Sequence, residues 1–336
     1  MDGITGVQPV FDEDLLHKLD KSARQYCKFK GNVFPGSQPV SMDTENIKFI
    51  QTRPYRVSWK ADGTRDNNFF KVHNLRFVQR DDLDKHIVNT LLDGEMVIDK
   101  HQGMSYPRYL VYDIVRINDV DVSTHAFYPH RLQYIENEII KPRHSAIMGG
   151  KIDKSKEPFS IRAKIFYPVE KAKSFLSEKF SNQLGHEPDG LIFQPSEDPY
   201  KAGQCIEVLK WKPPSHNSVD FRLKIALETG EGILRRKVGQ LFVGGYDPPF
   251  ATMRCTRDIK ELDNKIIECR LENDNWVFMR ERTDKSFPNR VETAWSVYNS
   301  IKNPITKEFL LDFIERYRYR SDDDMMPPPP RPSNRR

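Results

Sequence analysis

The chain has 336 residues, of which 38% are hydrophobic and 30% are charged, with a net charge of +5 and a pI near 8.8. This length allows one large domain or two ordinary ones, and the mean hydropathy of −0.68 indicates a soluble globular protein. No apolar run approaches bilayer length and no secretory pattern is visible, so we expect no membrane partner. The four scattered cysteines fit neither a zinc site nor a disulfide framework, which indicates a reducing compartment.

The first third of the chain contains a strand that ends in a candidate catalytic lysine. Residues 1–33 are predicted to be a mostly flexible linker with one helical pattern, roughly from Leu15 to Tyr26. From Tyr55 to Trp59, apolar and polar side chains alternate as in a half-buried strand, which places Lys60 on the polar face at the strand's end. Asp62-Gly63 then predicts a turn.

The middle of the chain repeats this strand-opening signal. A helical pattern is predicted through Leu83, Ile87 and Leu91, followed by strands that open at Asp93-Gly94 and Asp189-Gly190. The run 109–115 is almost continuously apolar, which is typical of a strand buried on both faces. These patterns predict a domain over residues 34–213, ending at a Pro-Pro pair.

Beyond this domain the pattern changes to short strands. Their spacing predicts a small barrel or sandwich over residues 214–300. A helix is predicted over residues 301–320, starting at Pro304 with Asn303 as its cap and with Ile305, Phe309 and Phe313 on one face. The tail 321–336 is acidic, then proline-rich, then basic, and is predicted to be disordered.

Lys60 is a candidate nucleophile, because desolvation and neighbouring positive charge lower the pKa of an amine. The alternative is a hairpin tip with a solvated lysine. Lys210 and Lys212 share one strand face opposite Trp211 and are the candidate neighbouring cations. Glu95 and Asp189 are hard oxygen ligands of the kind that Mg²⁺ or Mn²⁺ prefers.

Taken in order, these stretches resemble the covalent nucleotidyltransferases, which are the mRNA capping enzymes and the polynucleotide ligases. The resemblance lies in Lys60-x-Asp62-Gly63-x-Arg65, Asp93-Gly94-Glu95, Tyr112-Asp113, Asp189-Gly190, Lys210-x-Lys212 and Arg282-x-Asp284-Lys285. The stretches 211–214 and 278–289 are similar to the guanylyltransferase domain of animal bifunctional capping enzymes. The resemblance implies an α+β fold: a ligase-like, ATP-grasp-like nucleotidyltransferase domain of antiparallel sheets with helices, followed by an OB-fold β-barrel.

The resemblance also implies a role for each matching residue. Lys60 takes GMP from GTP as a phosphoramidate and passes it to the 5′-diphosphate end of nascent RNA, which gives a GpppN cap. The other residues with an implied role are the catalytic Lys210, Lys212, Arg282, Asp284 and Lys285, the ribose-binding Arg65 and Glu95, the purine-stacking Tyr112, the phosphate-proximal Asp220, and the metal ligands Glu95 and Asp189. Tyr112 as a core residue and Asp220 as a strand-start acid remain alternatives. The implied partners are GTP, Mg²⁺ or Mn²⁺, 5′-diphosphate RNA and the tail of RNA polymerase II, in the nucleus.

The sequence departs from the family pattern directly after Arg65. A strand pair with a second arginine is expected there, but the chain continues into Asp66-Asn67-Asn68, so Arg65 matches either of two family arginines. We expect this junction to remove a sheet edge and part of the guanine pocket, and so to impair activity. No His-Cys-x-x-x-x-x-Arg phosphate loop is present, so a triphosphatase half is expected to be missing. Two alternatives stay open: an ATP-dependent polynucleotide ligase, and a non-catalytic binding module.

Overall fold

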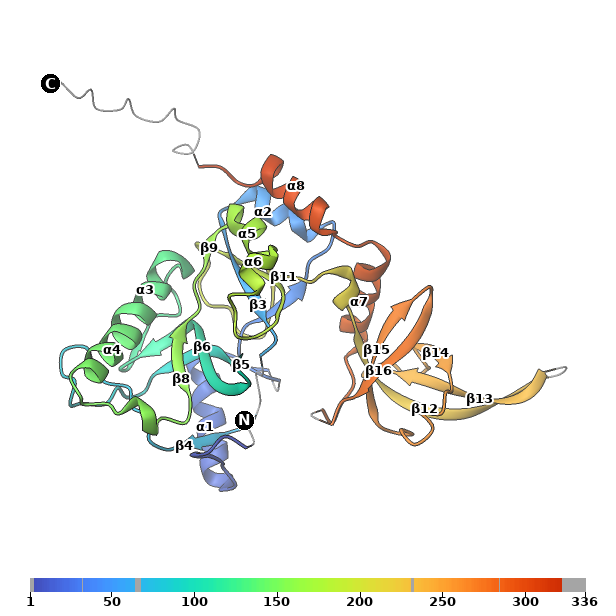
Figure 1. Cartoon of the computed structure of the whole chain (residues 1–336), viewed down its shortest axis with the longest axis horizontal. Coiled ribbons are helices and arrows are strands. Elements are labelled where there is room, and N and C mark those ends of the chain that lie inside the picture. Colours follow the sequence, from blue (N-terminus) through green and yellow to red (C-terminus); the bar gives the residue numbers. More distant parts are fainter. Residues whose placement is uncertain (1–2, 32, 64–67, 231–232, 284, 322–336) are drawn as a thin grey trace. The chain divides into compact units, whose positions relative to one another are not determined.

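The computed structural model describes residues 3–31, 33–63, 68–230, 233–283 and 285–321 (Figure 1). Arg65, Asp284 and residues 322–336 of the tail predicted to be disordered therefore lie outside the described residues. The chain forms two compact units: residues 1–40, 46–210 and 311–336 make up the first, and residues 41–45 and 211–310 the second. Both units combine strands with helices, which confirms the predicted α+β class. In the part of the chain that is described, no helix has the length and apolar composition that a membrane crossing needs.

The strands that carry the predicted site belong mainly to the first unit. Its five-stranded sheet has the order β2 (Gln38–Ser41), β11 (Gln204–Trp211), β10 (Pro188–Pro195), β3 (Tyr55–Ala61) and β9 (Tyr167–Pro168). A second sheet contains β5 (Leu91–His101), β6 (Met104–Ile117), β7 (Val120–Asp121) and, parallel to β6, β8 (Ser160–Ala163). β1 (Val7–Pro9) and β4 (Phe70–Val72) form a small antiparallel pair.

Helices of the first unit cover these sheets. A helical run along β6 comprises η2 (Phe127–Arg131), α3 (Leu132–Tyr134), η3 (Ile135–Ile140) and α4 (Lys141–Met148) (Figure 1). Ile135 and Ile139 of this run pack on Val111 and Ile114 of β6, and all four are nearly inaccessible to solvent. The shorter helices are η1 (Asn46–Lys48), α2 (Phe49–Thr52), η4 (Lys154–Lys156), η5 (Val169–Lys171), α5 (Ala172–Phe175) and α6 (Glu178–Ser181).

The first unit confirms one predicted helix and contradicts another. The helix predicted from roughly Leu15 to Tyr26 is α1 (Glu13–Tyr26), which follows β1 and starts where the Asp12 carboxylate accepts a hydrogen bond from the Leu15 amide at 3.0 Å. The prediction of a helix through residues 83–91 is wrong: Val78 pairs with His86 in a β-bridge, and β5 starts at Leu91. Asn89 has a φ of 40°, which a right-handed helix cannot accommodate.

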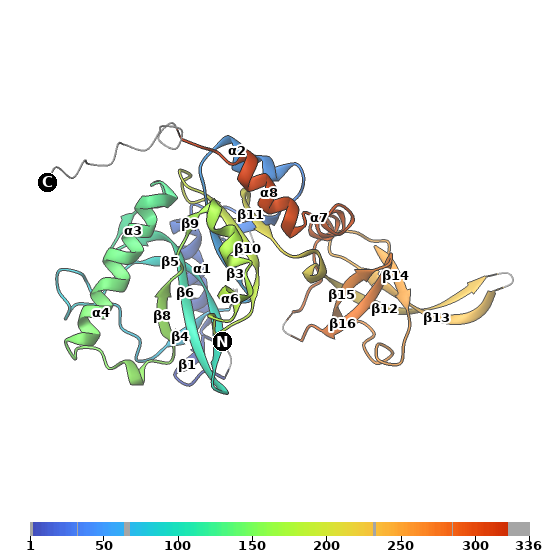
Figure 2. The same cartoon turned by 45° about the horizontal axis from the view of Figure 1, so that its top comes forward.

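The second unit is built on an antiparallel sheet. Its strands follow the order β14 (Ala251–Arg254), β13 (Ile233–Phe242), β12 (Val219–Gly230), β15 (Ile266–Glu272) and β16 (Asn275–Glu281) (Figure 2). The two edge strands β14 and β16 also lie against each other, so the sheet curls towards closure, as in the predicted OB-fold barrel. Phe221, Leu223 and Ile267 fill its interior together with Trp276.

Two helices follow the barrel, and the sequence analysis identified only one of them. α7 (Val291–Lys302) buries Ala294 and Val297 against the barrel core. α8 (Lys307–Tyr317) begins three residues later than predicted, where the Thr306 hydroxyl accepts a hydrogen bond from the Phe309 amide at 3.1 Å. Ile305 is buried whereas Phe309 is exposed, so the predicted common face is wrong. The short η6 (Pro214–His216) follows β11.

Candidate functional site

Lys60 and Asp189 lie opposite each other on neighbouring strands. Lys60 is the second-last residue of β3, and its Nζ donates a hydrogen bond to Asp189 Oδ2 at 2.5 Å. The β3–β10 register shifts between Pro188 and Leu191, which places the Asp189-Gly190 bulge beside Lys60. Gly190 has a φ of 113°, a backbone conformation that L side chains rarely adopt. The Asp-Gly motif therefore serves to direct a carboxylate at the predicted nucleophile.

The turn after Lys60 passes close to β5. A Cβ added at Gly63 would lie 2.8 Å from the Met96 carbonyl oxygen and 3.0 Å from Glu95 Oε2. Contacts this short require a residue without a side chain. The Lys-x-Asp-Gly turn and the Asp-Gly-Glu strand are thereby held in direct contact, although they come from different sheets.

Glu95 is held by a lysine that the sequence analysis did not single out. Lys164 Nζ lies 2.6 Å from Glu95 Oε1, and the side chains are 3% and 10% exposed. The same ammonium lies 5.7 Å from the Trp59 ring centroid and 5.8 Å from that of Tyr112. Tyr112 is half-buried rather than part of the closed core. A cation, a carboxylate and two aromatic rings thus converge within reach of the strand that carries Lys60.

A histidine fixes the orientation of Trp59. The indole Nε1 donates a hydrogen bond to His186 Nε2 at 3.2 Å, and His186 Nδ1 lies 2.7 Å from Asp99 Oδ1. Because an indole N–H only donates, Nε2 accepts and Nδ1 carries the proton towards Asp99. Arg108 contacts the other Asp99 oxygen at 2.9 Å. This network positions the aromatic ring next to Lys164 and one residue before Lys60.

The Tyr112-Asp113 motif has a second, structural half. Asp113 accepts two hydrogen bonds from the Arg131 guanidinium, at 2.7 and 3.0 Å, and Arg131 is fully buried. Burial raises the pKa of Asp113, whereas Arg131 acts in the opposite direction. Arg131 also donates to the carbonyl oxygen of Asp198 at 2.8 Å, which joins β6 to the segment after β10. The pair holds the strand that presents Tyr112.

The two remaining predicted cations, Lys210 and Lys212, lie at and just after the end of β11. Lys210 lies on β11, next to the strand that carries Asp189. Lys212 follows β11 and belongs to the second unit. The convergence of Lys210 and Lys212 on Lys60 stays a prediction.

The predicted cations of the second unit gather around Asp220. Arg282 Nη1 lies 3.0 Å from Asp220 Oδ1, and Lys285 Nζ contacts Asp220 Oδ2. The backbone amide of Asp220 donates to the Asn289 side chain at 2.8 Å, and the Asn289 amide donates back to the Asp220 carbonyl at 2.8 Å. These contacts hold the loop of the last motif against the start of β12.

Glu268 extends this cluster along β15. Its carboxylate lies 2.6 Å from Arg280 Nε and 3.7 Å from Arg282 Nη1, and it accepts a hydrogen bond from the Ser218 hydroxyl. Burial alone would raise the pKa of Glu268, but Ser218, Arg280 and Arg282 together lower it. Glu268 is therefore ionised in the folded protein at neutral pH.

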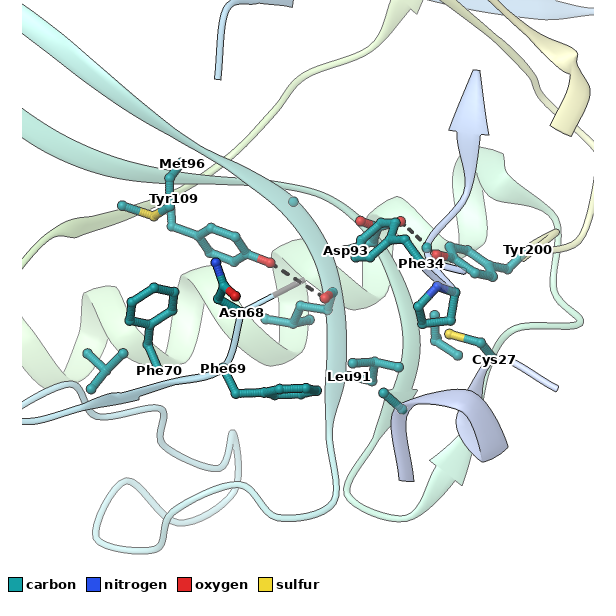
Figure 3. A pocket seen from close by; sticks show the side chains of 17 residues that line it. Cys27, Phe34, Asn68, Phe69, Phe70, Leu91, Asp93, Met96, Tyr109 and Tyr200 are labelled. Atoms are coloured by element: carbon teal, nitrogen blue, oxygen red, sulfur yellow. Dashed lines mark hydrogen bonds between the residues drawn. The ribbon is translucent and has the colours of Figure 1, made fainter. Parts of the chain in front are cut away.

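A pocket of about 310 Å³ lies beside β5 (Figure 3). Gly94 and Met96 line it, so the intervening Glu95 points to the other face of the strand. Tyr109 closes one side, and the Tyr200 hydroxyl donates to Asp93 Oδ2 at 2.6 Å at the other. Its lining is predominantly aromatic and aliphatic, in contrast to the charged surroundings of Lys60.

The two predicted metal ligands each contact a lysine. Asp189 and Glu95 lie 2.5 and 2.6 Å from Lys60 and Lys164. Within the described ranges, no group of three or more His, Cys, Asp or Glu side chains is arranged to hold an ion. Metal binding by Glu95 and Asp189 stays a prediction.

Comparison with known proteins identifies the family. Residues 1–66 and 64–214 match the family described as mRNA capping enzyme, catalytic domain, and residues 216–311 match mRNA capping enzyme, C-terminal domain. A mouse protein named mRNA-capping enzyme is 49% identical over 359 residues, covering 98% of this chain and 60% of the mouse protein. A zebrafish protein of the same name is 49% identical over 349 residues, covering 97% and 58%. The chain thus spans about 60% of the length of these two relatives.

One more distant curated relative is also a capping enzyme. The mRNA-capping enzyme subunit alpha of Schizosaccharomyces pombe is 30% identical over 323 residues, covering 83% of this chain and 79% of the yeast protein. A mycobacterial DNA ligase D complexed with ATP is 13% identical and covers 76% of this chain and 97% of its own, but its TM-score of 0.39 is too low to support an inference.

The catalytic-domain match falls into two stretches that meet at residues 64–66, where the sequence departs from the family pattern. The mouse alignment is also longer than the chain, 359 against 336 residues, so the mouse protein has residues where this chain has none. Both domain matches nevertheless succeed each other in the family's order and together cover residues 1–214 and 216–311. The chain belongs to the mRNA capping enzyme family, a family of nucleotidyltransferases, and it carries both the catalytic and the C-terminal domain.

Proposed function

We propose that this chain is an mRNA guanylyltransferase that works through Lys60. The neutral amine of Lys60 attacks the α-phosphorus of GTP, the bond from that phosphorus to the bridging oxygen breaks, and pyrophosphate leaves. The nitrogen releases a proton as the phosphoramidate forms. A β-phosphate oxygen of 5′-diphosphate RNA then attacks the same phosphorus, the P–N bond breaks, and the lysine nitrogen recovers a proton.

The observation that carries this proposal is the contact of Lys60 with Asp189 at the end of two neighbouring strands. The carboxylate orients the amine, and the packed Gly63 turn fixes the strand end against Glu95. The resemblance implies that Arg282 and Lys285, which contact Asp220 in the second unit, supply the positive charge that the β- and γ-phosphates of GTP require. Asp284 and Arg65, which complete the family's motifs, keep the roles that the resemblance implies.

Lys164 supports a choice of guanine over adenine. A purine stacked on Tyr112 would lie beside the Lys164 ammonium, which is 5.8 Å from the ring centroid. An ammonium only donates hydrogen bonds. Guanine presents an acceptor oxygen at its position 6, whereas adenine presents a donor amino group there. Glu95 is then the acceptor for the ribose hydroxyls that the resemblance implies.

We propose that the divalent cation arrives with the substrate, as the Mg²⁺ or Mn²⁺ complex of GTP. Asp189 and Glu95 offer oxygen atoms near the phosphates, in agreement with the ligand preference of both ions. Omission of the divalent salt should abolish label transfer to the chain without changing its thermal unfolding.

The test of the proposal is covalent labelling. With [α-³²P]GTP and Mg²⁺, the full chain should acquire one GMP, which mass spectrometry locates on Lys60, and Lys60→Ala should remain unlabelled. Labelling from ATP in place of GTP would favour the polynucleotide ligase. Binding of GTP without any adduct would favour the non-catalytic binding module. The loss of adduct formation would then be assigned to the junction after Arg65.

The remaining partners follow from the nature of the acceptor. A guanylyltransferase acts on nascent RNA, so we propose a nuclear location and binding to the tail of RNA polymerase II. A pull-down with phosphorylated and unphosphorylated tail peptides tests the partner, and imaging of a tagged chain tests the location. Retention of neither peptide would reject the partner.

A further inference from the structure

One face of the sheet in the second unit carries a surplus of basic side chains. On β12, Phe221 and Leu223 are buried in the barrel, so the intervening Arg222 and Lys224 point to the outer face. Strand register extends this face to the neighbouring strands. Its further members on β13 and β14 are Phe242, Gln240, Val238, Arg236, Thr252 and Arg254.

The cluster around Asp220 belongs to the same face. Asp220 pairs with Glu268 across β12 and β15, and Glu268 pairs with Arg280 across β15 and β16. At about 3.3 Å per residue, Lys224 lies roughly 13 Å along β12 from Asp220. The cations of the last motif, Arg282 and Lys285, therefore mark one end of a continuous basic surface.

The acids on this face are already engaged by neighbouring cations. Asp220 and Glu268 contact the arginines of the last motif, and Glu228 contacts Arg236 at 2.5 Å. Lys224 and Arg254 are exposed, and no carboxylate of the described residues contacts either of them. Together with Arg222, which donates to the carbonyl oxygens of Asn264 and Ser286, these two cations give the surface its excess positive charge.

An aromatic ring lies within the basic surface. Lys224 Nζ is 4.8 Å from the centroid of Phe242, which is only partly buried, and the polar side chains of Gln240 and Thr252 lie beside them. Cations that follow a phosphate backbone, together with a ring on which a base can stack, are the features by which OB-folds bind single-stranded nucleic acid. An acidic peptide would match the charge but would leave the ring unused.

We propose that this face binds the acceptor RNA, with the sugar–phosphate backbone on Lys224 and Arg254, a base on Phe242, and the 5′-terminal phosphates at Arg282 and Lys285. This inference rests on the proposed guanylyl transfer, because it assigns the path of that reaction's second substrate. It involves residues of the second unit only. It predicts that RNA affinity and GMP uptake can be separated by mutation.

The test uses the full chain with Lys224→Gln/Arg254→Gln, and a matched control that also removes two charges, Lys237→Gln/Lys260→Gln. Lys237 pairs with Leu227, and both side chains lie on the opposite face of the sheet from Lys224. Lys260 is exposed in the segment between β14 and β15. Fluorescence anisotropy with a labelled 5′-diphosphate oligoribonucleotide measures Kd at several salt concentrations.

The face variant should bind RNA about 10-fold more weakly, and its plot of log K against log salt should be less steep by about 1.4, or ~0.7 per lost phosphate contact. The control should retain the parent slope. Phe242→Leu should weaken binding at least ~5-fold with an unchanged slope, because stacking rather than charge is lost. In GMP transfer from the preformed adduct, KM for RNA should rise in the face variant while adduct formation from GTP stays unchanged.

Equal losses in the face variant and the control would overturn the proposal, since any surface cation would then serve. An unchanged salt slope in the face variant would also overturn it. If Phe242→Leu binds RNA normally while polyglutamate displaces RNA from the parent chain, the face is a site for acidic protein. Failure to form any GMP adduct would refute the proposed function alone, because the anisotropy measurements do not depend on it.

Discussion

The buried pair of Lys164 and Glu95 permits a quantitative prediction. The two side chains are 3% and 10% exposed, and their charged atoms are 2.6 Å apart. Lys164→Met keeps most of the side-chain volume but removes the ammonium, so Glu95 loses a charged partner in a place with little access to water. Loss of one partner of a buried ion pair costs about 3–5 kcal/mol. Since 1 kcal/mol corresponds to roughly 2–4 °C for a unit of 150–250 residues, we expect the unfolding temperature of the first unit to fall by about 6–20 °C.

Differential scanning calorimetry is the appropriate assay, because two compact units can give two transitions. Lys164→Met/Glu95→Gln should recover at least about 1.5 kcal/mol of the loss, since no uncompensated charge remains. Lys156→Met is the control for loss of a lysine from the surface, because that side chain is 75% exposed, and its effect should stay within about 0.5 kcal/mol.

Two results would refute this reasoning. A cost below about 1 kcal/mol for Lys164→Met would mean that water or another cation reaches Glu95. A double variant as unstable as Lys164→Met alone would mean that packing against the aromatic rings, and not the charge, accounts for the loss.

Three further predictions concern other parts of the chain. Gly63→Ala should reduce the rate of adduct formation at least ~10-fold, because the new Cβ would lie 2.8 Å from the Met96 carbonyl oxygen and would push the turn after Lys60 away from β5. An unchanged rate in single-turnover labelling would contradict this prediction. Burial raises the pKa of both Cys27 and Cys269 to about 12, so about one thiol in 10⁴ is ionised at pH 8. After brief treatment of the native protein with iodoacetamide, mass spectrometry should therefore find both cysteines unmodified. Rapid alkylation of either cysteine would be inconsistent with its burial. The pKa of Glu268 is lowered in the folded state, so its ionised carboxylate stabilises the fold at pH values above its usual pKa, and this stabilisation is lost as the pH falls through the lowered pKa. In calorimetry from pH 5 to pH 3, the parent should therefore lose stability more steeply than Glu268→Gln. Parallel stability curves for the two proteins would exclude this linkage.

The residues that sequence reasoning could place are those whose position follows from local alternation. Lys60 ends a strand whose apolar and polar side chains alternate, and Asp189 precedes a glycine that opens the neighbouring strand. Both features involve only a few consecutive residues. Their contact at 2.5 Å additionally needs the pairing of β3 with β10, which are about 130 positions apart, and the sequence patterns did not predict it.

Lys164 was missed for the corresponding reason. It follows β8, a strand of four residues that pairs in parallel with β6, and its amide donates to the Val111 carbonyl at 2.7 Å. Nothing in the neighbouring sequence shows that this short strand brings an ammonium beneath Tyr112 and Trp59. The available signal was a lysine directly after an alternating apolar segment, the same pattern that identified Lys60.

Helix α7 was overlooked although Ala294 and Val297 have helical spacing, because a barrel was expected to end in strands.

Lys60 and Lys285, which were predicted, and Lys164, which was not, share one arrangement: each contacts a carboxylate. Lys60 pairs with Asp189, Lys164 with Glu95, and Lys285 with Asp220. Each pair neutralises the charge of its ammonium before substrate arrives. Under the proposed function, the triphosphate of GTP would compete with the carboxylates for these ammonium groups, so part of its binding energy would be used to break existing pairs. Guanosine offers no such competitor, and it follows that the phosphates, and not the base, must release Lys60 and Lys285 from their carboxylates.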